Sequence, residues 1–194
     1  METIPLLPLT TVLFPTGKMP LQIFEPRYLD LISSSLKNDS GFGVVWLRDG
    51  SELDQPGSEP RLAQLGTLAR VVDWDSLPNG LLGITIEGTD KFRLISSHQR
   101  DDKLYMAEVE WVEPEPYIPL PEYSDEMAAL LAQLLDHPHI ARLKLSPVVD
   151  DIATMSHLLS QLLPIDEKIK FELLAITDPL LRMEQLMDLL DEYN

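Results

Sequence analysis

Residues 104–121 read LYMAEVEWVEPEPYIPLP, and the pattern of the chain changes within this stretch. Ala107 and Val109 alternate with Glu108 and Glu110, which predicts a strand with one buried face and one face in solvent. The segment that follows is predicted to be a stiff, extended hinge, because proline recurs at Pro114, Pro116, Pro119 and Pro121. The chain is therefore predicted to divide here into a lobe of residues 1–116 and a lobe of residues 117–194.

The N-terminal lobe is predicted to be rich in β-strands, because its apolar residues come in short runs separated by turn-forming residues. The runs are residues 4–9, 21–24, 42–47, 65–74, 81–87, 91–95 and 104–112. Turn-forming residues at 78–80 and 88–90 predict hairpins, so neighbouring strands should be antiparallel. One helix is predicted to begin at Pro26 and to end before Gly41, and the polar stretch 48–60 is predicted to be a loop.

Beyond the hinge the apolar spacing becomes helical and predicts four amphipathic helices. The first follows Ser124 as its cap, and the second is predicted to start with Ser146 as the cap and Pro147 in the first turn. The third follows Asp166, and the last begins at Asp178. Together the halves predict an α+β fold, in which an antiparallel β-rich lobe (a small folded sheet or pseudo-barrel with one helix) precedes a four-helix lobe.

The composition of the 194-residue chain limits the classes of partner that we expect the protein to bind. Its 32 acidic and 15 basic side chains give a net charge of −17 at pH 7, which repels the phosphates of nucleic acid. Cysteine is absent, which excludes a disulfide framework and a thiolate site. The N-terminus does not resemble a secretory signal, and apolar runs fall short of the roughly 20 residues that span a membrane. A cytoplasmic protein with neither nucleic acid nor membrane as partner is therefore expected.

The sequence contains no motif that is typical of a catalytic site. The nucleotide-binding P-loop and the Gly-x-Ser-x-Gly elbow of serine hydrolases are both missing. Ser156 and His157 are adjacent in a predicted helix, where neighbouring side chains diverge, so we interpret them as a pair on the helix surface. His137 and His139 lack further ligands nearby, so a metal site is not predicted. The sequence thus predicts no catalytic residue, no cofactor and no metal.

Several segments resemble one known family, the LON domain that forms the N-terminal part of the ATP-dependent Lon protease and also occurs in free-standing bacterial proteins. The segments follow the family's order over nearly the whole chain, although each is weak alone. They are IPLLPL at 4–9, VLFP at 12–15, PL at 20–21, FEPRY at 24–28, LGTLA at 65–69, IEG at 86–88, FRL at 92–94, LP at 163–164, residues 168–174, and Asp178, Leu181, Arg182 and Leu186.

The resemblance implies a PUA-like β fold and a non-catalytic module that binds proteins or unfolded peptide segments and delivers them to a protease or chaperone. It also implies a groove flanked by the two lobes. The family's ATPase and Ser-Lys peptidase modules are not expected, because the sequence ends at Asn194. The binding residues that we predict are Phe24, Glu25, Arg27 and Tyr28, at the junction of a strand and the first helix.

Alternative interpretations remain open at this point. Glu25 and Arg27 could instead satisfy buried backbone groups while Phe24 and Tyr28 pack in the core. The protein could also be a small-molecule-binding protein or an orphan hydrolase with its pocket between the lobes, or an interaction subunit that acts as an oligomer.

Overall fold

A computed structural model describes residues 1–48, 61–145 and 147–193. The predicted loop after Arg48 and the predicted cap Ser146 lie outside the described residues. The chain forms two compact units. The first comprises Met1–Leu13 and Lys18–Glu113, and the second comprises Phe14–Gly17 and Pro114–Asn194. Each unit is described separately below.

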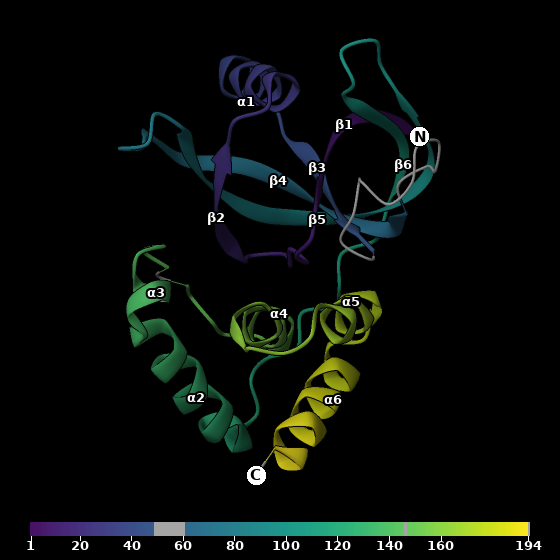
Figure 1. Ribbon diagram of the computed structural model, residues 1–194. Helices are drawn as coiled ribbons and strands as arrows, with labels where there is room; N and C mark the ends of the chain where they lie inside the picture. The colour runs from purple at the N-terminus through teal and green to yellow at the C-terminus, as the bar shows by residue number, and fades with distance from the viewer. Residues whose placement is uncertain (49–60, 146, 194) are drawn as a thin grey trace. The chain divides into compact units, whose positions relative to one another are not determined.

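The first unit is built on one six-stranded sheet (Figure 1). Its strands are β1 (Glu2–Leu9), β2 (Lys18–Ile23), β3 (Phe42–Leu47), β4 (Leu62–Ser76), β5 (Leu82–Gln99) and β6 (Tyr105–Trp111). They lie in the order β2-β5-β4-β3-β1-β6, and β6 also pairs with β5, which closes five of the strands into a barrel. The predicted α+β class and β-rich pseudo-barrel are confirmed.

One pairing in the barrel differs from the expected antiparallel pattern. β1 pairs with β3 in parallel, with Leu6 opposite Gly43 and Leu7 opposite Val44. Parallel neighbours need a long crossover, and here β2 and the first helix lie between β1 and β3 in the chain. Leu6 and Leu7 point to opposite faces and are both buried, which explains the unbroken apolar run in β1.

β5 is a single strand where the sequence predicted two strands and a turn at 88–90. Thr67 pairs with Lys91 and Ala69 pairs with Gly88, so β5 carries one more residue than β4 between these two pairs. The extra residue forms a β-bulge, which bends the strand without ending it. The predicted hairpin at 78–80 is confirmed, with Gly80 at a φ of 81° between β4 and β5.

In the described part of this unit the helix is α1 (Pro26–Asn38), and it agrees with the prediction. Proline occupies its first turn, and Asp39 ends it in the left-handed conformation at a φ of 49°. Tyr28, Leu31 and Ile32 of α1 are buried in a cluster with residues of the sheet. A second cluster lies on the other face of the sheet and contains Ile4, Leu6, Val45, Phe92, Ala107 and Val109.

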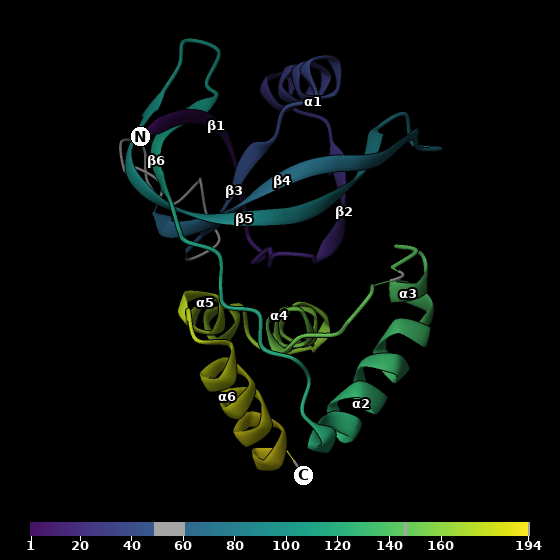
Figure 2. The same ribbon diagram turned by 180° about the vertical axis from the view of Figure 1, so that it is seen from behind.

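The second unit is helical (Figures 1 and 2). Its elements are the 3-10 turn η1 (Glu122–Ser124) and the helices α2 (Asp125–Asp136), α3 (Pro138–Ala141), α4 (Ile152–Leu162), α5 (Glu167–Ala175) and α6 (Pro179–Glu192). The four predicted helices are present, and η1 and α3 are additional single turns. In both views α4 lies between α2 and α6, and no helix in the described part of the chain is long and apolar enough to cross a membrane.

The predicted start of the second long helix is wrong. α4 begins at Ile152, where the Asp151 side chain accepts a hydrogen bond from the backbone N–H of Thr154 at 3.2 Å. The residues before it pair with the proline-rich hinge, because Leu120 donates its N–H to the carbonyl of Asp150 and Ile152 donates to that of Ile118. This pairing keeps the chain extended and delays the helix.

The short segment Phe14–Gly17 belongs to the helical unit although its neighbours on both sides belong to the barrel unit. Phe14 is fully buried, and its N–H donates to the Gln161 side-chain oxygen at 2.8 Å. The Phe14 ring lies 6.1 Å from the His157 ring. Both partners belong to α4, so this segment forms part of the core of the helical unit.

Candidate functional site

The four residues predicted for binding lie together at the junction of β2 and α1 but differ in exposure. The Phe24 side chain is 66% exposed, whereas Tyr28 is buried in the core cluster. Arg27 donates to Glu25 Oε1 at 3.1 Å and to the carbonyl of Lys103 at 2.9 Å. Its guanidinium also lies 4.6 Å from the centre of the Tyr28 ring, a cation–π contact. Phe24 is therefore the member of this group that offers apolar surface to solvent.

The Lys103 carbonyl, which accepts the hydrogen bond from Arg27, lies in a tight turn between β5 and β6. Lys103 has a φ of 72° in this turn, a left-handed conformation, and Gln99 also donates its side-chain amide to the Lys103 carbonyl at 2.9 Å. The Leu104 N–H donates to Asp102 Oδ1 at 3.1 Å, and this hydrogen bond lowers the pKa of Asp102. Arg27 thus links the start of α1 to a turn that the chain itself stabilises.

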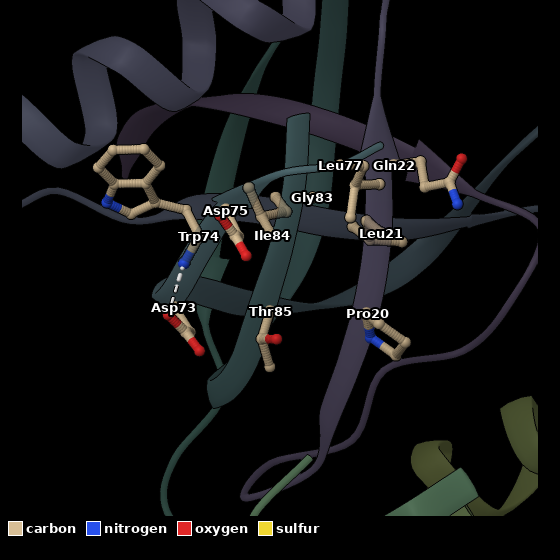
Figure 3. A pocket seen from close by; sticks show the side chains of 10 residues that line it. All are labelled: Pro20, Leu21, Gln22, Asp73, Trp74, Asp75, Leu77, Gly83, Ile84 and Thr85. Atoms are coloured by element: carbon tan, nitrogen blue, oxygen red, sulfur yellow. Dashed lines mark hydrogen bonds between the residues drawn. The ribbon is translucent and has the colours of Figure 1, made fainter. Parts of the chain in front are cut away.

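The barrel unit has an open hollow lined by β2, β5 and β4 (Figure 3). Its volume is about 320 Å³. β2 contributes residues 20–22, β4 contributes residues 73–75, and β5 contributes residues 83–85. Leu77, which follows β4, completes the lining. The hollow exists because three segments that are distant in sequence are brought side by side by strand pairing.

Strand register decides which side chains face the hollow. Pro20 and Asp73 both pair with Thr85, so these three residues form one row across the strands. Gln22 and Asp75 both pair with Gly83 and form the next row on the same face. Gly83 lets the Leu77 side chain lie close to β5, because a Cβ at position 83 would lie 2.9 Å from Leu77 Cδ2 and would force that side chain to shift. Figure 3 shows Leu77 close to Gly83, between β5 and β2.

The opposite face of the same strands is buried. Leu21 and Trp74 both pair with Ile84, which is 2% exposed within the core cluster. Trp74 is different, because its side chain is 58% exposed at the far side of β4. Among the described strands, β2 pairs with β5 alone, so its outer edge is open. Pro20 in β2 agrees with this position, since proline in a sheet is confined to edges and bulges.

Four residues supply the polar groups that line the hollow. Thr85, Gln22 and two carboxylates, Asp73 and Asp75, supply its polar groups, and Asp73 Oδ1 accepts the N–H of Trp74 at 2.9 Å. The described lining contains no imidazole or amine that would serve as the base of a nucleophile. The sequence analysis did not predict this hollow. The signals in the sequence that point to it are Pro20 in β2 and Gly83 in β5.

The helical unit contains a buried polar cluster that the sequence did not predict. The Arg182 side chain is 0% exposed and forms a bidentate ion pair with Glu115, one contact being 2.9 Å from Nη1 to Oε2. Arg182 Nε donates to the Leu173 carbonyl at 2.9 Å, and Nη2 donates to the Ile176 carbonyl. The cluster fixes the hinge residue Glu115 to α5 and α6.

Ser156 and His157 belong to this cluster, so the interpretation that they form a helix-surface pair is wrong. Ser156 is 0% exposed and His157 is 5% exposed. The Ser156 hydroxyl donates to the Ala153 carbonyl at 3.1 Å and accepts from Arg182 Nη1 at 3.2 Å, while His157 Nε2 lies 3.4 Å from Glu115 Oε1. The hydroxyl is therefore engaged on both sides and closed to substrate.

The helical unit also contains a buried lysine, Lys170, whose side chain lies near the end of α4. Lys170 donates from Nζ to the Gln161 carbonyl at 2.8 Å. Burial lowers the pKa of Lys170, and the nearby Glu167 opposes this shift. Across the described residues, no group of three or more His, Asp or Glu side chains is placed to hold a metal ion. His137 and His139 stack with ring centres 5.5 Å apart.

Fold and site together define a two-unit α+β domain with an open surface hollow on its barrel. The chain belongs to the family of the ATP-dependent protease La (LON) substrate-binding domain, whose sequence model matches residues 3–192. The predicted family resemblance is thereby confirmed.

Two solved structures share this fold. A Lon N-terminal domain protein from Xanthomonas campestris is 32% identical, superposes with a TM-score of 0.75, and is covered to 98% by 97% of this chain. The N-terminal domain of a Lon protease from the Mycobacterium avium complex, at 15% identity and a TM-score of 0.61, is covered to 97% by 96% of this chain. The second likeness shows the shared fold alone.

Full-length relatives are Lon proteases. The Lon protease of Cytophaga hutchinsonii is 24% identical over 203 residues, which include 98% of this chain and 24% of the relative. Lon protease 2 of Myxococcus xanthus is 32% identical over 95 residues, or 48% of this chain and 11% of the relative. The chain therefore spans about a quarter of the length of the first of these proteases.

Proposed function

We propose that the protein is a recognition module that binds extended segments of other proteins and does not cleave them. The observation that carries this proposal is the open hollow of about 320 Å³ on β2, β5 and β4, in a chain of the LON substrate-binding family. A hollow across exposed strands suits a polypeptide, because an extended segment offers side chains to it and backbone groups to a sheet edge.

One exposed aromatic residue extends the surface around the hollow. Phe24 follows directly after β2, whereas the Trp74 side chain lies on the far side of β4 (Figure 3). Aromatic residues often supply most of the affinity at a protein interface, because they bury a large apolar area with few rotatable bonds. In the proposed complex, Phe24 contacts apolar side chains of the ligand while Asp73 and Asp75 accept from its N–H or basic groups.

The other predicted site residues have a positioning role in this proposal. Arg27 joins Glu25 to the Lys103 carbonyl and covers the Tyr28 ring. These contacts fix the backbone that follows β2, and Phe24 lies in that segment. The binding role of this group is thus carried directly by Phe24 and indirectly by Glu25, Arg27 and Tyr28.

The proposed partners are unfolded or misfolded segments that the module passes to a protease or chaperone. The relatives that support this idea are Lon proteases, of which this chain matches the substrate-binding part. A cytoplasmic location, where such partners are synthesised, is part of the same proposal.

The binding role is tested with a labelled peptide in which apolar residues alternate with lysine and serine. Fluorescence anisotropy should show saturable binding to the full chain. Phe24→Ala should weaken binding about tenfold, because it removes an exposed aromatic contact. Leu36→Ala is the matched control, since Leu36 is an apolar residue that is 44% exposed on α1, away from the hollow.

Two outcomes would count against the proposal. Failure of the unmodified chain to bind the peptide would reject the recognition role itself. Equal binding by the Phe24 and Leu36 variants would reject the hollow as the site. Circular dichroism of each variant checks that the fold is kept.

The orphan-hydrolase alternative leads to a separate expectation. We expect no catalysed hydrolysis of ester, peptide or phosphate substrates, because the Ser156 hydroxyl is fully buried and hydrogen-bonded on both sides. Product formation is measured with the purified chain and with Ser156→Ala. Turnover that disappears in Ser156→Ala would establish the hydrolase and overturn the non-catalytic assignment.

A further inference from the structure

α6 has apolar residues on two faces, although one face would be enough to attach it to its own unit. Leu186 is fully buried on the inner face beside Pro179 and Arg182. On the outer face, the side chains of Leu180 and Met187 are 47% and 41% exposed. The outer face of α6 has apolar surface that the described residues do not cover.

This outer face forms one wall of a groove in the helical unit. The groove has a volume of about 350 Å³, and η1, α2 and the end of the hinge supply the rest of its walls. Ile152 at the start of α4 lies in it and is buried. Its apolar lining residues are Leu120, Met127, Ile152, Leu180, Met183 and Met187. Three of these six are methionines, whose flexible side chains adapt to apolar partners of different shape.

The charges along the groove all have one sign. Glu184, Asp188 and Asp191 are the charged residues in its described lining. Residues 125–136 and 179–192, which form α2 and α6, contain seven acidic residues and a single basic one, Arg182. Arg182 is fully buried and paired with Glu115, so it does not offset the acidic rim. The groove therefore favours a cationic ligand.

We propose that this groove is a second binding site and that its occupant is a cationic amphipathic helix of a partner protein. Leu or Ile side chains at helical spacing would enter between α2 and α6, and Lys or Arg side chains would face Glu184, Asp188 and Asp191. A helix suits the site because its walls are helices that offer side chains, not the free backbone groups that bind an extended strand. The site is separate from the barrel hollow and takes a different class of ligand.

Charge also decides between a partner helix and a second copy of this chain. The chain carries a net charge of −17, and its own α2 and α6 are acidic. Two copies that met at this groove would bring like charges together, which is unfavourable. The cationic partner has no such penalty.

The test uses the full chain with its methionine methyl groups labelled with ¹³C. The probe is a synthetic amphipathic peptide of leucine and lysine. Its addition should shift the methyl signals of Met127, Met183 and Met187, which line the groove, and leave those of Met19 and Met106 in the barrel unit unchanged. A leucine–glutamate peptide and a scrambled leucine–lysine peptide should not produce these shifts.

Matched variants separate groove binding from general attraction. Met187→Ser should weaken binding about tenfold, whereas Leu181→Ser should not, because Leu181 is 43% exposed on α6 but does not line the groove. Glu184→Lys combined with Asp188→Lys should weaken binding and reduce its dependence on salt. Glu172→Lys combined with Asp136→Lys, two exposed changes outside the lining of the groove, is the control for net charge.

Three results would overturn the proposal. The groove methyl signals could stay fixed at saturating peptide, the leucine–glutamate peptide could bind equally well, or the signals could shift with protein concentration alone. The last result would make a second copy the occupant. If the chain fails to bind the helical peptide but still binds the extended peptide, only the groove proposal is rejected. If it binds the helical peptide but fails to bind the extended peptide, only the proposed function is rejected.

Discussion

Replacing Arg182 with methionine is expected to lower the free energy of unfolding by about 3–5 kcal/mol, the range found when one partner of a buried ion pair is removed. The Glu115 carboxylate would remain buried without its guanidinium. The carbonyls of Leu173 and Ile176 would also lose the donor that Arg182 supplies. Methionine fills much of the volume, so the loss reflects the missing charge and hydrogen bonds more than a cavity.

Urea denaturation followed by circular dichroism measures this loss. Arg142→Met is the control, because Arg142 is exposed and follows α3 directly in the same unit. The double variant Arg182→Met with Glu115→Leu should recover part of the lost stability, since neither charge is then buried alone. A loss in Arg182→Met no larger than that in Arg142→Met would show that the ion pair does not hold the hinge to the helices.

Gly66→Ala is expected to lower the free energy of unfolding by about 2–3 kcal/mol, a typical cost of overpacking a filled core. A Cβ at position 66 would lie 2.5 Å from the Val44 carbonyl oxygen and 2.6 Å from Phe92 Cζ. The carbonyl belongs to the backbone of the paired strand β3, so it cannot move aside without disturbing the sheet.

Gly43→Ala is the matched comparison in the same core. The nearest atoms to a Cβ there are the ends of three side chains, with Phe92 Cζ at 2.7 Å. Side-chain ends can shift, so Gly43→Ala should cost less than Gly66→Ala, and Phe92→Leu should relieve more of the strain at position 43 than at position 66. Thermal unfolding gives the order, and a reversed order would contradict the role of the Val44 carbonyl.

Much of the fold followed from local patterns in the sequence. The alternation in 104–112 predicted β6, with Ala107 and Val109 buried and Glu108 and Glu110 exposed, as the structure shows. Gly80 marked the hairpin between β4 and β5. These features depend on neighbours in the chain, which the sequence displays directly.

Features that depend on distant partners were not predicted. Gly88 and Asp90 suggested a turn, but pairing with β4 makes them part of a bulged strand. Pro147 suggested the start of a helix, but pairing of the hinge with residues 150–152 keeps the chain extended up to Ile152. In both cases local preference was outweighed by tertiary contacts.

The candidate site was predictable only in small part. Phe24 was named from the family resemblance, and its exposed ring belongs to the proposed binding surface. The hollow itself joins Pro20, Asp73 and Thr85 through strand register, and no pattern along the chain brings these three together. The buried environment of Ser156 also depends on a distant residue, Arg182 from α6.

The placement of Phe14–Gly17 has a consequence for how this domain can be altered by recombination. The segment is supplied from within the barrel portion of the chain, yet its Phe14 ring fills the core beside α4. A helical fragment that begins at the hinge would lack the Phe14 ring, so the apolar residues that pack against this ring would be exposed to water. The helical half therefore cannot be exchanged between proteins on its own. A gene fusion would have to transfer both halves together.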